Sequence, residues 1–528
     1  FRLNERGLQW IDKEDWVYET CFTLAADMMR KENMELVFEG LDTYADVYLN
    51  DECILKADNM FRRWSIPVRQ YIREENNILK VYFHSPVKID VPKWDALPYQ
   101  YPASNDQSEN GGLFNKKISI FARKAGYHYG WDWGPRLVTS GIWRPVYIRA
   151  WSDLRINDVF IEQKEVGAGR AVIAGHVELD ADKDMDGVLV TITDEATGRV
   201  LGEWQADLKR GTNRVTVDFV LHKPKLWWSN GLGEPFLYRF RTDIIAGGEL
   251  LDSKTERVGI RSLKVVHQPD KDGHTFYIEL NGRPVFAKGA NYIPSDNFLP
   301  RVTPENYKRT ILDAAGVNMN MLRVWGGGIY ENDVFYDLCD EHGIMIWQDF
   351  MFACSMYPAE GALLDNIHQE AVDNVKRLRN HACIALWCGN NECQDAWLGW
   401  GWKCEIERQN KEYADKIWAQ YRQQYHVTLP GVVREYAPGT FYWPSSPFAF
   451  EGEMSGATDG DRHYWSVWHG KAPISDYDSE KSRFFSEYGF QSFPEFDSVK
   501  RYAPYPEDWD IRSEVMMSHQ RGGDHANG

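Results

Sequence analysis

The sequence lacks the features that mark membrane proteins and nucleic-acid-binding proteins. No apolar run approaches the ~18–20 residues that a membrane-spanning helix needs. Lys and Arg number 60 against 78 Asp and Glu, and the resulting formal charge of −18 leaves no basic stripe to bind a phosphate backbone. We therefore expect neither a membrane nor a nucleic acid as a partner.

The eight cysteines contain no Cys-x-x-Cys pair, which disfavours a zinc site and a disulfide framework. We expect free thiols, most of them buried. The sequence also contains no Asn-X-Ser/Thr triplet, the acceptor of N-linked glycans. Both observations favour a bacterial periplasm or cytoplasm over a eukaryotic lysosome. The chain begins at Phe1 without a signal peptide, so its compartment stays open.

Aromatic residues are abundant, at 14% of the chain with 22 Trp. Packing accounts for most of them, but an indole ring also covers the flat C–H face of a sugar while its edge donates a hydrogen bond. Sugar recognition is therefore one function to test against the motifs.

The first half of the chain reads as two β-domains. Residues 1–150 contain short β-rich runs separated by turn residues and no sustained helical period, which predicts a β-sandwich. In residues 151–265, Val188, Val190 and Ile192 alternate with polar neighbours, as in half-buried strands. The length of this segment suits an immunoglobulin-like sandwich.

The second half, residues 266–528, alternates between strand and helix patterns. Thr303 and Pro304 begin a helix that Gly316 ends, and further helices are expected over 333–342, about 365–380 and about 405–425. The expected strands are Val285–Asn291, Met319–Val324, Ile344–Gln348, Ile384–Trp387, Phe441–Trp443, Tyr464–Trp468 and Arg483–Phe485. Seven parallel strands in series predict a (β/α)8 TIM barrel, C-terminally incomplete because no eighth strand follows.

Two carboxylates follow strands of this predicted barrel. Glu392 comes after the fourth strand and Glu487 after the seventh. Barrel enzymes collect their reactive groups at the carboxyl ends of the strands, and these two strands face each other across the barrel mouth. Retaining glycosidases need two carboxyl groups about 5–5.5 Å apart. A single Glu in such a place could instead cap a helix, but the matched pair favours catalysis.

At this point the sequence resembles family 2 of the glycoside hydrolases, and within it the β-mannosidases. The motifs that carry the resemblance span most of the chain and follow in order: Asp58–Trp64, Gly130–Arg136, Leu226–Gly231, Arg323–Gly328, Tyr442–Pro447 and Ser486–Ser492. The resemblance implies a sugar-binding jelly roll, an immunoglobulin-like sandwich and a catalytic barrel. This order agrees with the division at about residues 150 and 265.

The resemblance also implies residue roles. Glu392 would be the acid/base, Glu487 the nucleophile, and Asn391 would bind the sugar 2-hydroxyl. Arg323 would hold Glu487 ionised and oriented. Trp131 and Asp132 would reach over the barrel mouth from the first domain and block one end of the pocket, which predicts exo-action on a terminal sugar.

Further side chains are candidates for the sugar pocket. Trp325, Trp400 and Trp465 would form its walls, although each is also explained by packing. The run Gly326–Gly328 lacks the spacing of a phosphate loop and predicts close approach of backbone to the sugar or to Trp325. His469 and His381 lie near strand ends, where core or turn roles are the simpler interpretation. The chemistry requires no metal or other cofactor.

The preferred hypothesis is a retaining exo-enzyme that releases terminal β-D-mannose from oligosaccharide or glycan substrates. A related family 2 exo-enzyme acting on β-galactosides, β-glucuronides or β-glucosaminides is the first alternative. A carbohydrate-binding protein with a dead barrel is the second, and the presence of both glutamates with Asn391 and Arg323 argues against it. The sequence leaves linkage preference and homo-oligomer formation open.

Overall fold

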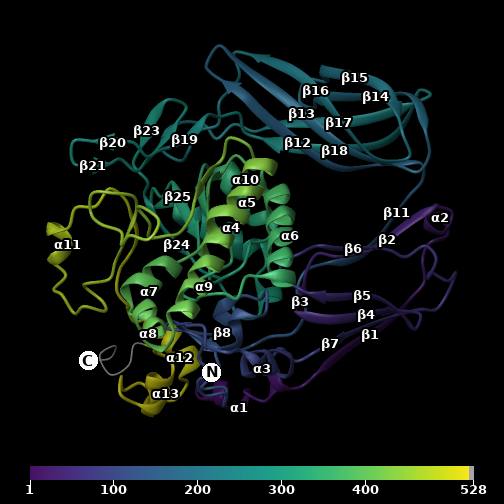
Figure 1. The fold of residues 1–528 in the computed structure, drawn as a ribbon. Helices are drawn as coiled ribbons and strands as arrows, with labels where there is room; N and C mark the ends of the chain where they lie inside the picture. The colour runs from purple at the N-terminus through teal and green to yellow at the C-terminus, as the bar shows by residue number, and fades with distance from the viewer. Residues whose placement is uncertain (522–528) are drawn as a thin grey trace.

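The computed structural model describes residues 1–521, and its first part is a β-sandwich (Figure 1). The sandwich begins with short helix α1 (Asn4–Gly7), and two antiparallel sheets enclose a core that includes Phe38, Val47 and Val81. One sheet has the order β1 (Trp16–Phe22), β7 (Asn77–Phe83), β4 (Tyr44–Leu49), β5 (Glu52–Asp58); the other has the order β11 (Val146–Trp151), β2 (Asn33–Phe38), β6 (Trp64–Pro67). Burial alternates along β7, as the period of two predicts.

The expectation that residues 1–150 hold no sustained helix is wrong. Helix α3 (Pro86–Ala96) follows β7, and the side chain of Ser85 caps it by accepting from the Lys88 backbone N–H at 3.1 Å. Pro92 lies inside the helix and weakens its sequence pattern, because proline is rare in helix interiors. Burial of Val87 and Trp94 against the core stabilises the helix despite this proline.

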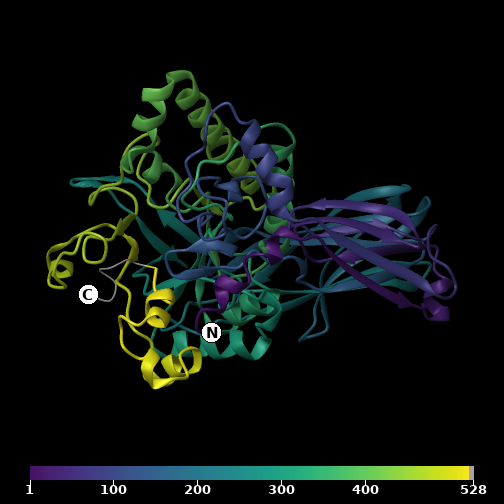
Figure 2. The ribbon, with the colours of Figure 1, turned by 90° about the horizontal axis from the view of Figure 1, so that it is seen from below.

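The second part is a separate antiparallel sandwich. Val177, Leu179, Val188, Val190 and Ile192 lie in its core, which confirms the predicted alternation. One sheet has the order β12 (Leu154–Val166), β13 (Arg170–Ala181), β16 (Gly211–His222); the other has the order β15 (Arg199–Leu208), β14 (Met185–Asp194), β17 (Tyr238–Ala246), β18 (Glu249–Val258). Seen from below, both sandwiches extend to the same side of the third part (Figure 2).

The third part is a parallel α/β region. Its five-stranded parallel sheet has the order β24 (Gly289–Tyr292), β25 (Met321–Val324), β26 (Met345–Asp349), β27 (Ile384–Cys388), β28 (Phe441–Trp443). The helices between these strands are α4 (Pro304–Gly316), α5 (Asp333–His342), α6 (Gly361–Leu378), α7 (Cys393–Gly399), α8 (Trp402–Gln409), α9 (Lys411–Arg422) and α10 (Leu429–Tyr436). Because the strands are parallel, their carboxyl ends lie at one edge, which positions the site described below.

Several expected strands have different bounds. The strand expected at Val285–Asn291 is two elements: β23 (Arg283–Val285), which pairs in a hairpin with β22 (Tyr277–Leu280), and β24. The helix expected at about 405–425 is divided among α8, α9 and a π-helical turn at Gln423–Thr428. Asn410 divides α8 from α9, since its extended backbone ends α8 and its side chain caps α9 by accepting from the Glu412 N–H.

The last two strands, β29 (Arg462–Tyr464) and β30 (Phe485–Tyr488), pair in parallel with each other. The strands expected at Tyr464–Trp468 and Arg483–Phe485 are displaced: β29 begins two residues before the first of these, and β30 begins two residues after the start of the second. Glu487 therefore lies within β30 rather than after it. No eighth parallel strand occurs in residues 1–521.

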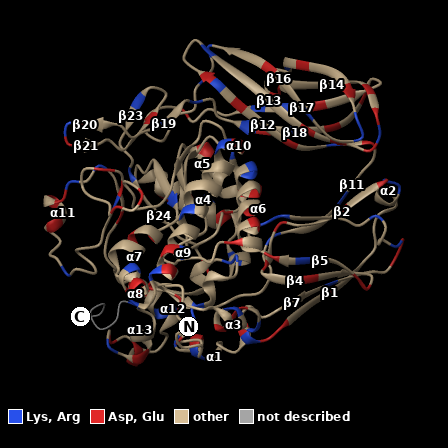
Figure 3. Cartoon of the chain, in the orientation of Figure 1, with Lys and Arg blue, Asp and Glu red and all other residues tan. Residues whose placement is uncertain are grey.

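The C-terminal part of the described chain returns to its beginning. The Arg2 backbone N–H donates to the Tyr502 carbonyl at 2.8 Å, and the side chain of Arg521 pairs with Glu5. In residues 1–521, no helix combines the length and apolar character that crossing a membrane would take. Figure 3 colours the acidic and basic residues along the ribbon, and both kinds are interspersed over all three parts.

Candidate active site

One cavity of about 1520 Å³ is lined by residues at the carboxyl ends of the parallel strands and extends along the edge strand β24 as far as Val285. All nine residues that the sequence suggested for the site line this cavity. They are Trp131, Asp132, Arg323, Trp325, Asn391, Glu392, Trp400, Trp465 and Glu487. The fold thus brings together side chains from the first sandwich and from five segments of the α/β region.

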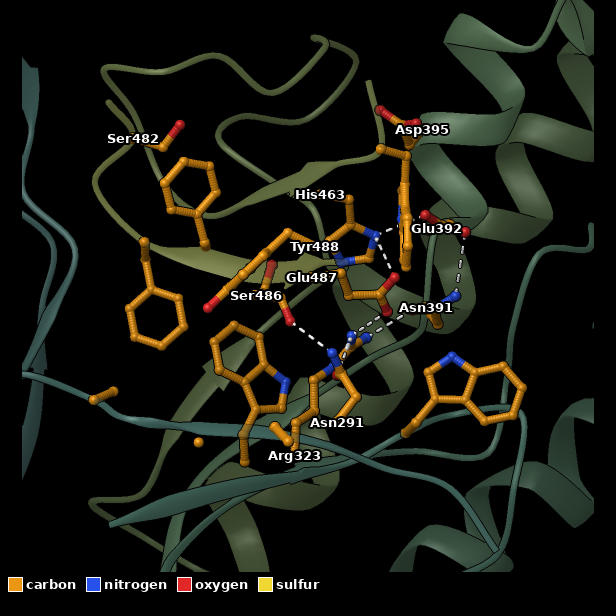
Figure 4. Close-up of a pocket in the computed structure, with 18 of the residues that line it drawn as sticks. Asn291, Arg323, Asn391, Glu392, Asp395, His463, Ser482, Ser486, Glu487 and Tyr488 are labelled. Atoms are coloured by element: carbon orange, nitrogen blue, oxygen red, sulfur yellow. Dashed lines mark hydrogen bonds and ion pairs between the residues drawn. The ribbon is translucent and has the colours of Figure 1, made fainter. Parts of the chain in front are cut away.

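Glu392 and Glu487 face the same space from different strands. One carboxylate oxygen of each lies within 4.8 Å of the other and of a ring nitrogen of His463. Figure 4 shows the imidazole of His463 next to both carboxylates. Its Nδ1 atom is 2.7 Å from Oε1 of Glu392 and 3.4 Å from Oε2 of Glu487. Two acidic groups at this spacing can attack and protonate one bond between them.

Glu392 is held by its backbone at the N-terminus of α7. Its φ angle is +61°, an uncommon left-handed conformation for a non-glycine residue, and its N–H donates to the Ser446 carbonyl at 2.7 Å. The Cys354 thiol donates to Oε2 at 3.1 Å. Burial raises the pKa of the Glu392 carboxyl, with Cys354 and the charge of Arg323 opposing the rise. A raised pKa favours the protonated form that a general acid needs.

Arg323 orients Glu487 from β25. Its Nη1 donates to Oε1 of Glu487 at 2.5 Å, while its Nη2 donates to Oδ2 of Asp349 and to Oδ1 of Asn391, each at 2.8 Å. Burial would lower the pKa of Arg323, but Asp349 and Glu487 raise it. Burial raises the pKa of Glu487, and the neighbouring His463 and Arg323 oppose this and favour the carboxylate. Arg323 is buried, so its hydrogen-bonding groups serve these side chains.

Sequence reasoning missed several polar residues of the site. Asp349 ends β26, so the rule that barrel sites collect at strand ends points to it as well. His463 was not recognised as a site residue because the strand that contains it was expected to begin one residue later, at Tyr464. Asn291 of β24 links the two ends of the strand series, since its Nδ2 donates to the Ser486 carbonyl at 3.0 Å.

Tryptophans from the first and third parts form one wall of the cavity. Trp131 ends β8 (Tyr129–Trp131), which forms a hairpin with β9 (Gly134–Arg136), and its ring meets Trp325 edge to face at 4.6 Å. Asp132 and Trp133 occupy the turn and line the cavity. Trp133, which the sequence analysis did not single out, also contacts Trp325, at 5.6 Å.

Trp400 and Trp465 lie elsewhere on the cavity lining. Trp400 is 43% exposed and packs edge to face against Trp402, with ring centres 5.5 Å apart. Trp465 is half-buried beside His469, with their ring centres 5.6 Å apart. His469 lines the cavity too. His381 does not line it; its Nδ1 atom lies 2.7 Å from Oδ2 of Asp340.

The glycine run beside Trp325 confirms the predicted close approach of backbone to that ring. A Cβ atom on Gly327 would lie 1.9 Å from Cη2 of Trp325. The Gly327 carbonyl also accepts from the Tyr127 N–H at 2.9 Å, which fastens the segment before β8 to the α/β region.

We therefore expect Gly327→Ala to displace Trp325 and to lower kcat/KM by about 10–100-fold for the glycoside substrates that the sequence resemblance implies, since small displacements in a site have effects of this size. Gly134→Ala is the matched control, because a Cβ there meets nothing within 4 Å. Steady-state kinetics of both variants check the expectation. Equal kinetics for the two variants would contradict a role for this close approach.

Within residues 1–521, two groups of side chains have donor atoms close enough together to hold a metal ion. One is Glu392, His463 and Glu487; the other is Asp340, His381 and Cys383. In the second group Asp340 already accepts from His381 and from the Cys383 backbone N–H, at 2.7 Å each. Burial raises the pKa of the Cys383 thiol well above its usual value, which disfavours the thiolate that metals bind. All eight cysteines are free thiols; Cys21, Cys53 and Cys404 are exposed and the other five are buried.

Two family models match the chain. The model described as "Glycosyl hydrolase 2 galactose-binding domain-like" matches residues 1–144, and "Glycosyl hydrolases family 2" matches residues 154–261. Beta-mannosidase B of Aspergillus fumigatus is 36% identical over 530 residues, which cover 99% of this chain and 61% of the relative. The chain belongs to family 2 of the glycoside hydrolases.

Other relatives agree with this family 2 membership. Beta-mannosidase B of Aspergillus clavatus is 35% identical over 529 residues, which cover 99% of this chain and 61% of the relative. The crystal structure of a beta-D-mannosidase from Dictyoglomus thermophilum matches with a TM-score of 0.89 and 36% identity, over 99% of this chain and 62% of that one. The chain spans about three fifths of the length of these relatives.

Proposed function

We propose that this family 2 protein is a retaining exo-β-mannosidase that releases terminal, non-reducing β-D-mannose. The observation that carries the proposal is the placement of Glu392 and Glu487, whose oxygens lie within 4.8 Å of each other in one cavity. This spacing suits direct attack by a carboxylate and leaves no room for the intervening water of an inverting enzyme. The β-mannosidases among its relatives support the choice of sugar.

In the first step, Glu487 attacks the anomeric carbon while Glu392 protonates the glycosidic oxygen. The bond from the anomeric carbon to that oxygen breaks, the aglycone leaves as an alcohol, and the sugar is held as an ester of Glu487. Arg323 keeps Glu487 ionised and aimed until the attack. The raised pKa of Glu392 supports its role as the proton donor.

In the second step, Glu392 works as a base. Its carboxylate takes a proton from water, the water oxygen attacks the anomeric carbon, and the ester bond to Glu487 breaks. Both carboxyl groups then return to their starting states. Asn391 binds the sugar 2-hydroxyl, and this contact strengthens as positive charge develops on the ring in each transition state.

The hairpin from the first sandwich makes the pocket suited to a chain end. Asp132 and Trp131 close one side of the cavity, with Asp132 binding sugar hydroxyls and the ring of Trp325 covering a sugar face. Trp400 and Trp465 complete the walls. A pocket that is closed on this side accepts a terminal sugar, which supports exo-action.

The same proposal covers the division into domains. We assign residues 1–150 to a sugar-binding jelly roll, 151–265 to an immunoglobulin-like sandwich and 266–528 to a catalytic domain of the (β/α)8 barrel type, in which the described residues form seven parallel strands. The seven parallel strands, with reactive groups at their carboxyl ends, support the barrel assignment.

A panel of aryl β-glycosides tests the choice of substrate. We expect the mannoside to be turned over with kcat/KM at least ~100-fold above the galactoside, glucuronide and glucosaminide, because a site that hydrogen-bonds specific hydroxyls rejects sugars that misplace them. Preference for any other sugar overturns the substrate assignment. Binding of mannosides without turnover of any glycoside would favour a carbohydrate-binding protein.

A further inference from the structure

His463 has no part in the two steps above, yet it contacts both glutamates. It is bonded through Nδ1 to Glu392 and through Nε2 to Ser446, with Nε2 3.0 Å from the Ser446 Oγ. Burial lowers the pKa of His463 to about 4, with the charge of Glu487 opposing the change. The ring is therefore neutral near neutral pH and carries one N–H, which lies on either Nδ1 or Nε2.

Asp461, beyond Ser446, decides which nitrogen carries this hydrogen. Its Oδ1 accepts from the Trp443 Nε1–H at 2.7 Å and from the Phe448 N–H at 2.9 Å. Its Oδ2 accepts from the hydroxyls of Ser446 at 2.6 Å and Ser486 at 2.5 Å. Four donors on a fully buried carboxylate match its acceptor sites, and removing any of them leaves part of a buried charge unsatisfied.

The hydroxyl hydrogen of Ser446 is thus directed to Asp461. A serine hydroxyl has only one hydrogen to donate, so its oxygen must accept from His463. Nε2 then carries the N–H, and Nδ1 presents a lone pair to Oε1 of Glu392 at 2.7 Å. A lone pair and a carboxylate oxygen repel at this distance unless a proton lies between them.

We propose that His463 is a positioning residue whose Nδ1 accepts a hydrogen bond from the protonated carboxyl of Glu392, because Asp461 and Ser446 fix the ring N–H on Nε2. This inference rests on the proposed function in assigning the proton a catalytic use. The hydrogen bonds that link Asp461, Ser446 and His463 then favour the protonated form of Glu392 in the free enzyme. After Glu392 has donated its proton to the leaving oxygen, its carboxylate faces the same lone pair. This contact makes it a stronger base toward water in the second step.

The opposite tautomer would have Nδ1 donate to Glu392 and would favour the carboxylate. Two charges near His463 bear on the choice. Glu487 lies 3.4 Å from Nδ1 and favours an N–H there, but Arg323 neutralises Glu487 on its other oxygen. The other titratable and charged groups that act on Glu392 or respond to its charge are Cys354, Cys393, His469, Asp132 and Asp395. The two tautomers shift the titration of Glu392 in opposite directions.

The decisive experiment compares Ser446→Ala with Ser486→Ala in the full chain. Each substitution removes one hydroxyl donor from Oδ2 of Asp461, but only Ser446 also contacts His463. In Ser446→Ala the Nε2–H loses its acceptor, so the hydrogen moves to Nδ1 and donates to Glu392. We expect the pKa of Glu392 to fall by about one unit in Ser446→Ala, the usual scale of one hydrogen bond. In Ser486→Ala the pKa of Glu392 stays within a few tenths of a pH unit of its value in the parent protein.

The titration is followed by carbon-13 NMR of protein labelled at the glutamate carboxyls, with the Glu392 signal assigned by its absence from Glu392→Gln. An unchanged or raised pKa in Ser446→Ala, or equal shifts in both variants, overturns the proposal. Nitrogen-15 NMR of the parent protein gives a second test that needs no serine variant to fold. The His463 ring signals are assigned by their absence from His463→Gln. They must show a hydrogen on Nε2 and none on Nδ1. Both measurements need no substrate, so they stand even if the enzyme acts on another sugar or on none.

Discussion

Glu487→Ala is expected to lower kcat for an aryl β-mannoside by at least ~10⁴-fold, because the variant has no group to form the glycosyl ester. No other carboxylate of the described chain is placed to replace it. Asp349 is fully buried and held by Arg323 and by the Gly326 N–H at 3.0 Å. Glu487→Gln is the matched variant, since it keeps the side-chain size and loses only the charge. We expect equal losses in both variants, with thermal unfolding showing that both remain folded.

Mass spectrometry identifies the attacking atom directly. In a 2-fluoro mannoside the fluorine destabilises the positive charge of both transition states and slows both steps, but a good leaving group speeds the first step, so the ester forms and accumulates. The parent protein should gain the mass of one fluoro-sugar on the peptide that contains Glu487, and Glu487→Ala should gain none. A label on another residue, or none on active enzyme, would refute the assignment of Glu487.

Sequence patterns located the site because its chemistry follows strand order. Glu392 and Glu487 were found from their positions near the ends of the fourth and seventh strands, and both line the cavity. The alternation at Val188, Val190 and Ile192 identified the second sandwich for a similar reason, since a period of two places each on the buried face. In both cases the regular repeat of the backbone allows the direction of a side chain to be predicted from its position in the sequence.

The misses share a different cause. Helix α3 contains Pro92, and only its packing against the core overrides the weak local preference. His463 and Ser446 are recognisable as site residues only through their contacts with Glu392 and Asp461. Asp461 lies 69 positions after Glu392 in the sequence. The left-handed backbone of Glu392 was equally invisible, because it depends on the hydrogen bond from its N–H to the Ser446 carbonyl. Such features arise from contacts between segments that are distant in sequence.

Glu392→Ala is expected to separate the two chemical steps. An activated aryl mannoside needs little protonation to leave, so the first step still proceeds and releases a burst of one aryl alcohol per enzyme. The second step lacks its base and slows by about 10²–10⁴-fold, so the glycosyl ester accumulates. Azide needs no base to attack and fits the space left by the side chain. Azide should therefore restore turnover of Glu392→Ala and yield the β-mannosyl azide. The matched variant Glu392→Gln leaves less space, so azide should rescue it less.

The pH dependence of kcat/KM gives an independent check on the same residue. Glu392 must be protonated in the first step, and burial raises its pKa, so kcat/KM of the parent for a poorly leaving aglycone should fall as the pH rises through that raised value. Glu487 must be ionised, so kcat/KM should also fall as the pH drops through the pKa of Glu487. Removing Glu392 abolishes the alkaline fall and keeps the acidic one, because Glu487 and Arg323 remain. If the alkaline fall persisted in Glu392→Ala and azide gave no rescue, the proton donor would have to be another group. The nearest titratable side chain would then be His463, whose ring nitrogen lies 2.7 Å from the carboxylate that it would replace.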